Sequence, residues 1–464
     1  MQRATPLVRF VHLAAAGFFL AALATPAAAV PVFSRKYRTS CQTCHVIFPK
    51  LNPLGEAFRL NGYRLPGETD QLVKQPPVSL GSDAYEKIWP DAVFPSTLPG
   101  NAPLAINVKL ANIFASSHGE DGRQIVHNDF QFPQEVNLFA AGTLGKSFSF
   151  FGELVWGERP DGSTETEIEH ARIDIISAFG PDHLINFRIG KLTPGIFAGF
   201  QEMWLMTDNG VDALFGYAPV NLNGGTGFEG GGVSLPAHAR AIEMYGVAAH
   251  RLFYTVGVAN PIGPGGPGDT FGSNSRKDLY ARIDYKFGGM GLDGDVTGVT
   301  VPDENWRETS FRVGVFGYTG DGTNIDTPLT GPDGTEFNMQ DLRYDRIGVY
   351  GSLLLGDLNL FGAAVHGTDK LLLREAETGE DVSVTTKSYD AWFAQADWVI
   401  KPAFQVSVRY ENLRPADETV RTSQVINANV SFLARANIKL MLEYRRDLHD
   451  SQSYTLATVL RTAF

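Results

Sequence analysis

Apolar and polar residues alternate in segments of roughly ten residues from about residue 104 to residue 464. One clear segment is Phe404-Gln405-Val406-Ser407-Val408-Arg409-Tyr410, and another is His170-Ala171-Arg172-Ile173-Asp174-Ile175. Successive side chains of a strand point to opposite faces, so a strand between lipid and a polar lumen requires this period of two. A soluble β-sandwich alternates as well, and the alternation alone leaves both architectures open.

Three further features favour a membrane barrel. Aromatic residues gather near segment ends, as in the girdles of membrane barrels: Trp156, Tyr410 and Tyr444. Short connections such as Gly145-Lys146 and Gly356-Asp357 alternate with longer Gly- and Asp-rich ones such as 320–337. The last segment ends on Phe464, and a terminal Phe that closes an alternating strand resembles the signal by which bacterial outer-membrane barrels are recognised for insertion.

The number of segments predicts the size of the barrel. They begin near residues 104, 132, 147, 167, 183, 226, 239, 251, 278, 308, 344, 357, 387, 402, 424, 436 and 453. That is one more than sixteen, and bacterial single-chain barrels have an even number of strands, so one segment is a loop or part of a longer strand. We therefore predict an all-β transmembrane barrel of about 16 antiparallel strands over residues 101–464.

The first 29 residues have the layout of a secretory signal peptide. Arg3 and Arg9 precede an apolar run over residues 10–23, and Ala27-Ala28-Ala29 is a small-residue cleavage site. The alternative is an uncleaved anchor, but the run is short for a spanning helix, which needs about 20 apolar residues. We expect export, followed by insertion into the outer membrane of a Gram-negative bacterium.

Composition excludes several classes of protein. The formal net charge is 39 minus 51, or -12, so no excess of Lys and Arg is available for the phosphates of nucleic acid. The chain has only two Cys, which rules out a disulfide framework. No Ser/His/Asp or paired-carboxylate arrangement indicates a hydrolytic enzyme, and no catalytic residue is assigned.

Both cysteines lie in one pentapeptide, Cys41-Gln42-Thr43-Cys44-His45. This is the C-x-x-C-H pattern of c-type haem attachment. Two thiols at this spacing reach the two vinyl groups of one porphyrin, and the adjacent His presents its imidazole to the iron. The alternatives are a redox dithiol or half of a zinc site, but no βαβ context and no second ligand pair accompany the motif.

The residues after this motif, within a predicted haem domain and linker over 30–100, predict a short helix. Asn52 is the expected N-cap, Pro53 the first helical residue and Gly62 the left-handed stop. Leu54, Ala57 and Phe58 recur at helical spacing. Their apolar face is suited to covering a porphyrin, or alternatively to packing on the barrel.

A self-contained cytochrome c usually supplies a Met or a second His as the sixth iron ligand. None is present between Val46 and Ser117 or between Val30 and Ser40. The sixth position is therefore empty, filled by water or an unusual ligand, or supplied by the barrel. His170 and Met441 fall on the predicted lumen-facing side and are weak candidates, since a polar or space-filling role in the lumen is the better explanation of each one alone.

Two other signals are set aside. Gly263-Pro264-Gly265-Gly266-Pro267-Gly268 matches G-x-G-x-x-G, but its prolines and the polar stretch after it indicate a loop. Asp321, Asp326 and Asp333 offer oxygen ligands for Ca²⁺ or Fe²⁺, although ordinary turn residues explain them as well.

An N-terminal C-x-x-C-H unit ahead of a single-chain barrel resembles the fused outer-membrane cytochrome–porin family, whose best-known members oxidise iron. The resemblance is most specific over residues 40–63. There the motif is followed by Phe48-Pro49, Leu51, Gly55, Phe58 and Asn61-Gly62-Tyr63. It implies one covalently attached haem c, with thioethers at Cys41 and Cys44 and His45 as axial metal ligand. Over the barrel the likeness is one of architecture.

This resemblance leads us to expect electron transfer across the outer membrane, from extracellular Fe(II) to a periplasmic carrier such as a cytochrome or a copper protein. An acidic chain favours local accumulation of cations such as Fe²⁺. Three alternatives stay open: outward electron flow to an extracellular acceptor, a solute porin with a structural haem plug, and a soluble periplasmic β-protein that carries haem.

Overall fold

The computed structural model describes residues 32–69, 72–74, 78–79, 97–98, 103–118, 123–158, 164–196, 207, 235, 238–261, 276–299, 307–321, 327–330, 335–416, 422–449 and 452–464. The predicted signal peptide, the glycine-rich loop at 263–268, Asp326 and Asp333 lie outside these residues. Asp321 is described, and it forms an exposed ion pair with Arg276 at 2.7 Å.

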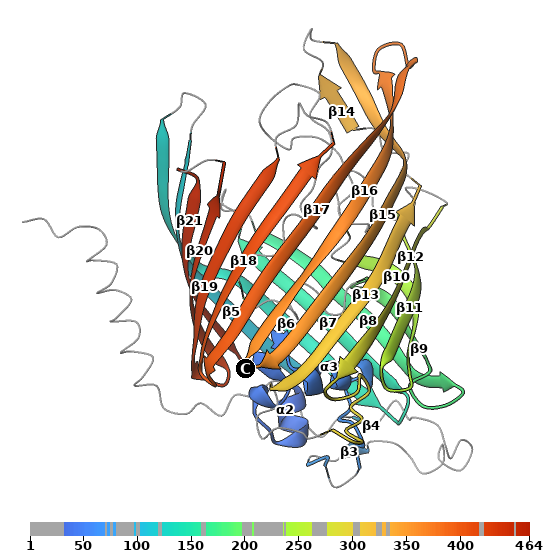
Figure 1. Ribbon diagram of the computed structural model, residues 1–464, viewed down its shortest axis with the longest axis vertical. Helices are drawn as coiled ribbons and strands as arrows, with labels where there is room; N and C mark the ends of the chain where they lie inside the picture. Colours follow the sequence, from blue (N-terminus) through green and yellow to red (C-terminus); the bar gives the residue numbers. More distant parts are fainter. Residues whose placement is uncertain are drawn as a thin grey trace, which may run out of the picture.

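A closed antiparallel barrel accounts for most of the described residues (Figure 1). Its strands are β5 (Leu104–His118), β6 (Gln124–Leu144), β7 (Phe148–Glu158), β8 (Thr164–Phe179), β9 (Ile185–Leu192), β10 (Ala239–Ala248), β11 (Leu252–Ala259), β12 (Asp278–Gly288), β13 (Glu308–Gly320), β15 (Glu336–Gly356), β16 (Leu358–Glu375), β17 (Asp381–Lys401), β18 (Phe404–Pro415), β19 (Ser423–Arg435), β20 (Ile438–Asp447) and β21 (Tyr454–Ala463). Strand β21 pairs with β5 and closes the ring.

The predicted number of strands is confirmed for the described part of the chain, where sixteen strands form the ring. The predicted segment at 226 begins outside the described residues, and each of the other sixteen predicted segments coincides with one strand. The short strand β14 (Thr327–Thr330) falls within the predicted long connection 320–337. It pairs with β15 beyond the point where β13 and β15 pair directly, so it extends one hairpin.

Side chains alternate between the two faces of the barrel as the sequence predicts. On β18, Val408 is 50% exposed while the next residue, Arg409, is completely buried. On β8, Ile173 is 53% exposed and Asp174 is buried. Apolar side chains thus cover the outside and charged ones the inside, which is the polarity of a barrel in lipid. The chain is an outer-membrane barrel of the Gram-negative type, and a soluble β-protein is excluded.

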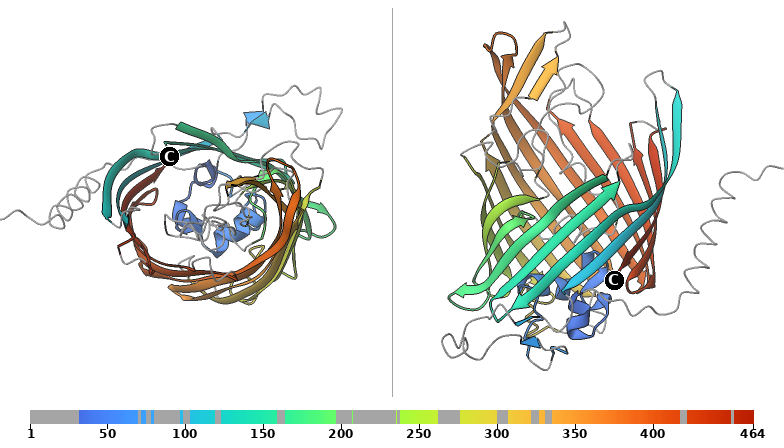
Figure 2. Two further views of the ribbon diagram at one scale, coloured as in Figure 1. Left: turned by 90° about the horizontal axis from the view of Figure 1, so that it is seen from above. Right: turned by 180° about the vertical axis from the view of Figure 1, so that it is seen from behind.

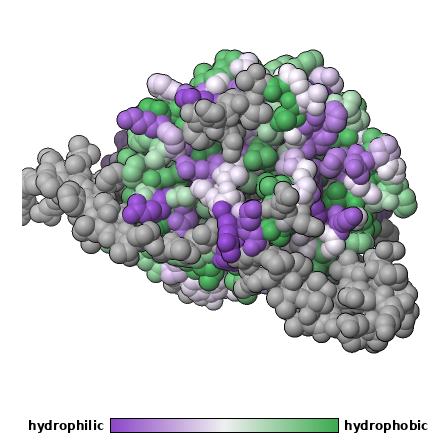
Figure 3. All heavy atoms as spheres, turned by 90° about the horizontal axis from the view of Figure 1, so that it is seen from below, coloured by the Kyte–Doolittle hydropathy of each residue, from purple (hydrophilic) through white to green (hydrophobic). Residues whose placement is uncertain are grey.

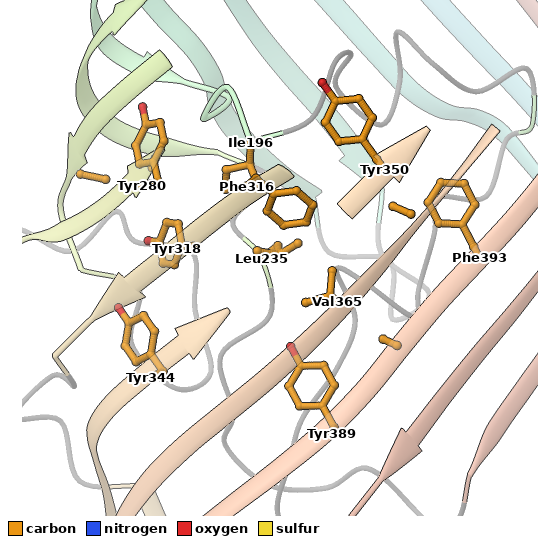
Figure 4. Close-up of a cluster of buried hydrophobic side chains, with 14 of the residues drawn as sticks. Ile196, Leu235, Tyr280, Phe316, Tyr318, Tyr344, Tyr350, Val365, Tyr389 and Phe393 are labelled. Atoms are coloured by element: carbon orange, nitrogen blue, oxygen red, sulfur yellow. The ribbon is translucent and has the colours of Figure 1, made fainter. Parts of the chain in front are cut away.

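The interior is filled by paired polar groups and by aromatic rings. Tyr318 and Tyr344 both donate hydrogen bonds to the Asp278 carboxylate, at 2.5 and 2.6 Å. These tyrosines belong to a cluster of buried side chains on the inner wall (Figure 4). Buried charges are tolerated here because most have partners, as Arg409 has in Glu411 at 2.7 Å.

The N-terminal unit (residues 32–69) lies in the end of the barrel where the C-terminus is found (Figures 1 and 2). It consists of helix α2 (Val32–Tyr37), the 3-10 turn η1 (Cys41–Thr43), the small hairpin β1 (His45–Ile47) and β2 (Lys50–Leu51), and helix α3 (Pro53–Leu60). Strands β3 (Val78–Ser79) and β4 (Thr97–Leu98) pair separately. Hydrophilic and hydrophobic residues are mixed on this end of the molecule (Figure 3).

The N-terminal unit contains only these small helices, and much of its contact is with the barrel. None of the helices described here is long and apolar enough to cross a membrane. Short turns connect the strands at this end, including a single residue between β15 and β16. Because bacterial barrels have short turns on the periplasmic side, the N-terminal unit plugs the periplasmic end.

Candidate cofactor site

Helix α3 begins and ends as predicted. The Asn52 side-chain oxygen accepts a hydrogen bond from the Gly55 amide at 2.8 Å, Pro53 is the first helical residue, and Gly62 has a φ of +60°. Asn52 also donates from Nδ2 to the carbonyl oxygens of Gln42 and Thr43, at 3.3 and 3.1 Å. One side chain thus caps the helix and ties it to the C-x-x-C-H turn.

Gly55 is where the helix touches the motif. A Cβ at this position would lie 2.0 Å from the carbonyl oxygen of Cys44, far inside the contact distance of real atoms. Only glycine allows the helix backbone to approach the motif this closely.

The side chain of His45 is held in one orientation. Its Nδ1 lies 3.0 Å from the carbonyl oxygen of Pro49, which can only accept a hydrogen bond. The Nδ1–H tautomer follows, and Nε2 is left as the atom with a lone pair for a metal. Burial lowers the pKa of His45, so the ring is neutral, as a ligand must be.

Cys41 and Cys44 form no disulfide. Burial raises the pKa of both thiols, that of Cys44 to about 12, and the neighbouring Cys41 adds to the effect on Cys44. A reactive dithiol needs the thiolate form, so this buried pair does not have the environment of a redox dithiol.

Both cysteines and His45 line a cavity of about 290 Å³ between the N-terminal unit and the barrel wall. This is close to the lower end of the range for small-molecule sites, roughly 300–1,000 Å³. Aromatic rings form much of the lining. Phe33 stacks on Tyr63 with centroids 5.1 Å apart, and Tyr63 stacks on Phe151 of β7 at 5.7 Å. Flat apolar walls of this kind suit a flat apolar ligand.

Two apolar residues of α3 have different surroundings. Phe58 lines the cavity, as it would if it covered a porphyrin. Leu60, on another side of the helix, packs in a buried cluster with Ile176, Tyr245 and Phe253 of the barrel. Of the predicted face, Phe58 lies at the cavity, while the barrel contact of Leu60 comes from a residue outside that face.

The two candidates for a sixth ligand differ. Both face inward as predicted, and His170 and Met441 are 2% and 3% exposed. His170 lines the same cavity as the C-x-x-C-H motif. Met441 instead packs in a separate cluster with Ala111, Ala457 and Val459. The cavity thus brings together Cys41, Cys44, His45 and His170, and Met441 is not part of it.

Sequence reasoning missed two basic residues in the cavity lining, Arg59 and Arg461. Burial lowers the pKa of Arg59 to about 10, and the positive charge of Arg188 acts in the same direction. Arg461 forms an ion pair with Glu135 at 3.5 Å, so Arg59 is the basic residue best placed to balance the charge of a ligand with carboxylates. No local signal could have identified Arg59, because its role depends on which face of α3 meets the cavity.

Polar contacts hold the plug in the barrel. Lys50 forms a buried ion pair with Asp397 of β17 and donates to Asn359 of β16 at 2.8 Å. Arg312 of β13 pairs with Glu56 at 3.2 Å. Arg64 donates to two carbonyl oxygens of the barrel, both at 2.7 Å. These contacts connect the plug to β13, β16 and β17 and to the turn between β6 and β7.

Taken together, the residues present fit a covalently attached haem c. They supply two thiols, an oriented imidazole, an aromatic cavity and the basic side chain of Arg59 for the porphyrin carboxylates.

The sequence matches no protein-family model and no curated protein. Among solved structures, the chain is similar to the outer-membrane protein OmpT of Vibrio cholerae, with 10% identity over 78% of this chain and 98% of that chain and a TM-score of 0.47. OmpF of Salmonella typhi in complex with daunomycin has 10% identity over 78% and 97% of the two chains, with a TM-score of 0.49. An anion-selective porin from Comamonas acidovorans has 11% identity over 78% and 99%, with a TM-score of 0.47.

Proposed function

We propose that this porin-like outer-membrane barrel holds one haem c in its periplasmic plug and transfers electrons across the outer membrane, from extracellular Fe(II) to a periplasmic carrier. The observation that carries the proposal is the position of the C-x-x-C-H motif, which lines an aromatic cavity inside the barrel together with His170. A bound haem would supply one-electron redox chemistry. Each Fe(II) would lose one electron, and the carrier would gain it.

The residues of this chain would have distinct roles. Cys41 and Cys44 would form the thioethers, and His45 would bind iron through Nε2 because Pro49 accepts the hydrogen of Nδ1. Phe58 and Tyr63 would exclude water from the cavity. Arg59 would balance the charge of the porphyrin carboxylates.

A solute channel with a structural haem plug is the second candidate. It is favoured by the porin-like architecture, a ring of sixteen strands around a charged interior. Thr207 accepts a hydrogen bond at 2.7 Å from Arg409 of β18, whose side chain faces the inside of the barrel. A polar contact at this place would narrow a channel and select its solutes.

The test uses the full chain extracted in detergent. We expect the absorption bands of an oxidised c-type haem, which change to those of the reduced form when Fe(II) is added without oxygen. The variant His45→Ala should lose this response, while His366→Ala, which removes an exposed histidine of β16, should keep it. Haem bands that respond only to a stronger reductant would overturn Fe(II) as donor and favour outward flow. Ordinary ion conductance of the haem-loaded protein without any Fe(II) response would favour the solute channel.

A further inference from the structure

Three metal-binding side chains gather inside the barrel beside the cavity. Glu169, His170 and His238 each offer one donor atom, and these atoms lie within 4.8 Å of one another. Glu169 and His170 belong to β8, and His238 directly precedes β10. The two imidazole rings are 4.8 Å apart and nearly perpendicular, at 89°.

A break in the strand pairing brings Glu169 into this group. Glu153 of β7 pairs with His170, but the next residue, Leu154, pairs with Ile168. Glu169 is therefore the extra residue of a β-bulge. In regular alternation it would face away from His170, whereas a bulge redirects the side chain. As a result, Glu169 Oε2 lies 3.8 Å from His238 Nε2.

A second carboxylate orients His170. Glu153 Oε2 lies 2.9 Å from His170 Nδ1, and Thr193 Oγ1 lies 2.9 Å from Nε2. A carboxylate on one ring nitrogen, with the other nitrogen directed at the metal, is the usual support for a ligating histidine. A metal ion at Nε2 would take the place of the Thr193 hydroxyl.

The nearby positive charges have partners of their own. Lys191 pairs with Glu167 at 2.8 Å, and Arg172 pairs with Asp174 at 3.3 Å. These partners offset part of the positive charge, which lowers the electrostatic barrier to a cation at the cluster.

From this arrangement we propose that Glu169, His170 and His238 bind a divalent first-row transition-metal ion. Two imidazoles and one carboxylate form a ligand set that suits Fe(II), Zn(II) and related ions, with positions left open for other ligands. The proposal also assigns His170 to this ion and not to the sixth position of a haem. Since His170 lines the haem cavity as well, the ion would lie next to it. If the proposed function holds, this is the site where Fe(II) would be held as the electron donor.

Zn²⁺ is the first probe, because it takes the same ligands and has no redox chemistry. The full chain in detergent is equilibrated with Zn²⁺, and the bound metal is measured by calorimetry and elemental analysis. We expect one Zn²⁺ per chain at this site. His238→Ala and Glu169→Gln should each weaken Zn²⁺ binding at least tenfold. Loss of a hydrogen-bond partner of a metal ligand already weakens metal binding by about this factor, and these variants remove a ligand itself. His366→Ala is the matched control and should bind Zn²⁺ as the unaltered chain does.

Two results would overturn the proposal. One is Zn²⁺ binding that His238→Ala and Glu169→Gln leave unchanged while circular dichroism shows that both variants are folded. The other is a changed haem spectrum of His170→Ala in metal-free buffer together with undiminished Zn²⁺ binding, which would assign His170 to the haem iron.

The Fe(II) response separates this proposal from the proposed function. If Zn²⁺ binding depends on His238 but Fe(II) does not reduce the haem, the metal site is supported and Fe(II) oxidation is contradicted. In the opposite case, Fe(II) reduces the haem of His238→Ala as fast as that of the unaltered chain, and Zn²⁺ binding does not depend on His238. This result would support Fe(II) oxidation and contradict the metal site.

Discussion

Asn52 and Gly55 are joined by a hydrogen bond of 2.8 Å between the side-chain oxygen of the first and the backbone amide of the second. This contact starts helix α3 next to the C-x-x-C-H turn. The Nδ2 group of the same Asn52 holds two carbonyl oxygens of that turn. The local signal for a helix start therefore also determines the geometry of the candidate cofactor site.

Replacement of Asn52 tests these two roles separately. Asn52→Ala removes the cap and both bonds to the turn, and should destabilise the plug by about 2 kcal/mol, or roughly thirtyfold in the opened fraction. Asn52→Ser keeps an uncharged capping oxygen but lacks the amide donors, so its loss should be smaller. The rate of limited proteolysis of the plug in detergent measures both. Equal rates for the two variants would show that the cap itself contributes nothing.

Gly55→Ala should disturb the turn directly. The added Cβ would lie 2.0 Å from the Cys44 carbonyl oxygen, so the helix must move away. Overpacking of this kind costs about 1–3 kcal/mol, and we expect a lower yield of attached haem. Gly157→Ala on β7 is the control, because its nearest atom would lie at an ordinary 3.6 Å. The ratio of haem absorbance to protein measures the yield, and equal ratios in both variants would contradict the prediction.

The buried pair of Lys50 and Asp397 should be a main anchor of the plug. Lys50→Met leaves the Asp397 carboxylate buried without its cation, a change that typically costs about 3–5 kcal/mol. We expect more frequent channel openings in planar bilayers. The double variant Lys50→Met/Asp397→Asn should recover part of the closed state, since no charge is then left unpaired. Arg343→Ala, which breaks an exposed pair with Asp345, should not change the conductance. A single variant that is as closed as the unaltered chain would refute the anchoring role.

The turn that carries His250 should respond to pH. A hydrogen bond of 2.7 Å to Asp293, followed by the charge of that carboxylate, raises the pKa of the exposed His250, and Asp295 acts in the same direction. Because folding raises this pKa, the contact stabilises the turn fully at a pH below the pKa of His250 in the unfolded state, about 6.5. The stabilisation is lost as the pH rises through the higher pKa of the folded state.

Titration of the His250 ring signal by NMR in detergent measures this shift. Asp293→Asn should bring the pKa back toward 6.5. An unaltered pKa in that variant would assign the shift to other groups.

Features that depend only on neighbours in the chain could be predicted from the sequence. Alternation at Val408-Arg409 predicts which side chain meets lipid, because a strand turns successive side chains to opposite faces whatever its partners. Local backbone chemistry likewise predicts the helix cap at Asn52 and the helix end at Gly62. It also predicts the alternation of short and long connections. The hypothesis of a covalently attached haem rests on the motif at residues 41–45, and it stays a prediction.

The tertiary structure decided which distant residues meet. His170 and Met441 have the same parity on their strands, and only the order and register of the ring place His170 at the cavity and Met441 in another cluster. Glu169 has the wrong parity, and a bulge that depends on the pairing of β7 with β8 turns it toward His238. Periodicity describes one strand at a time, whereas such contacts depend on how the strands close into a ring around the plug.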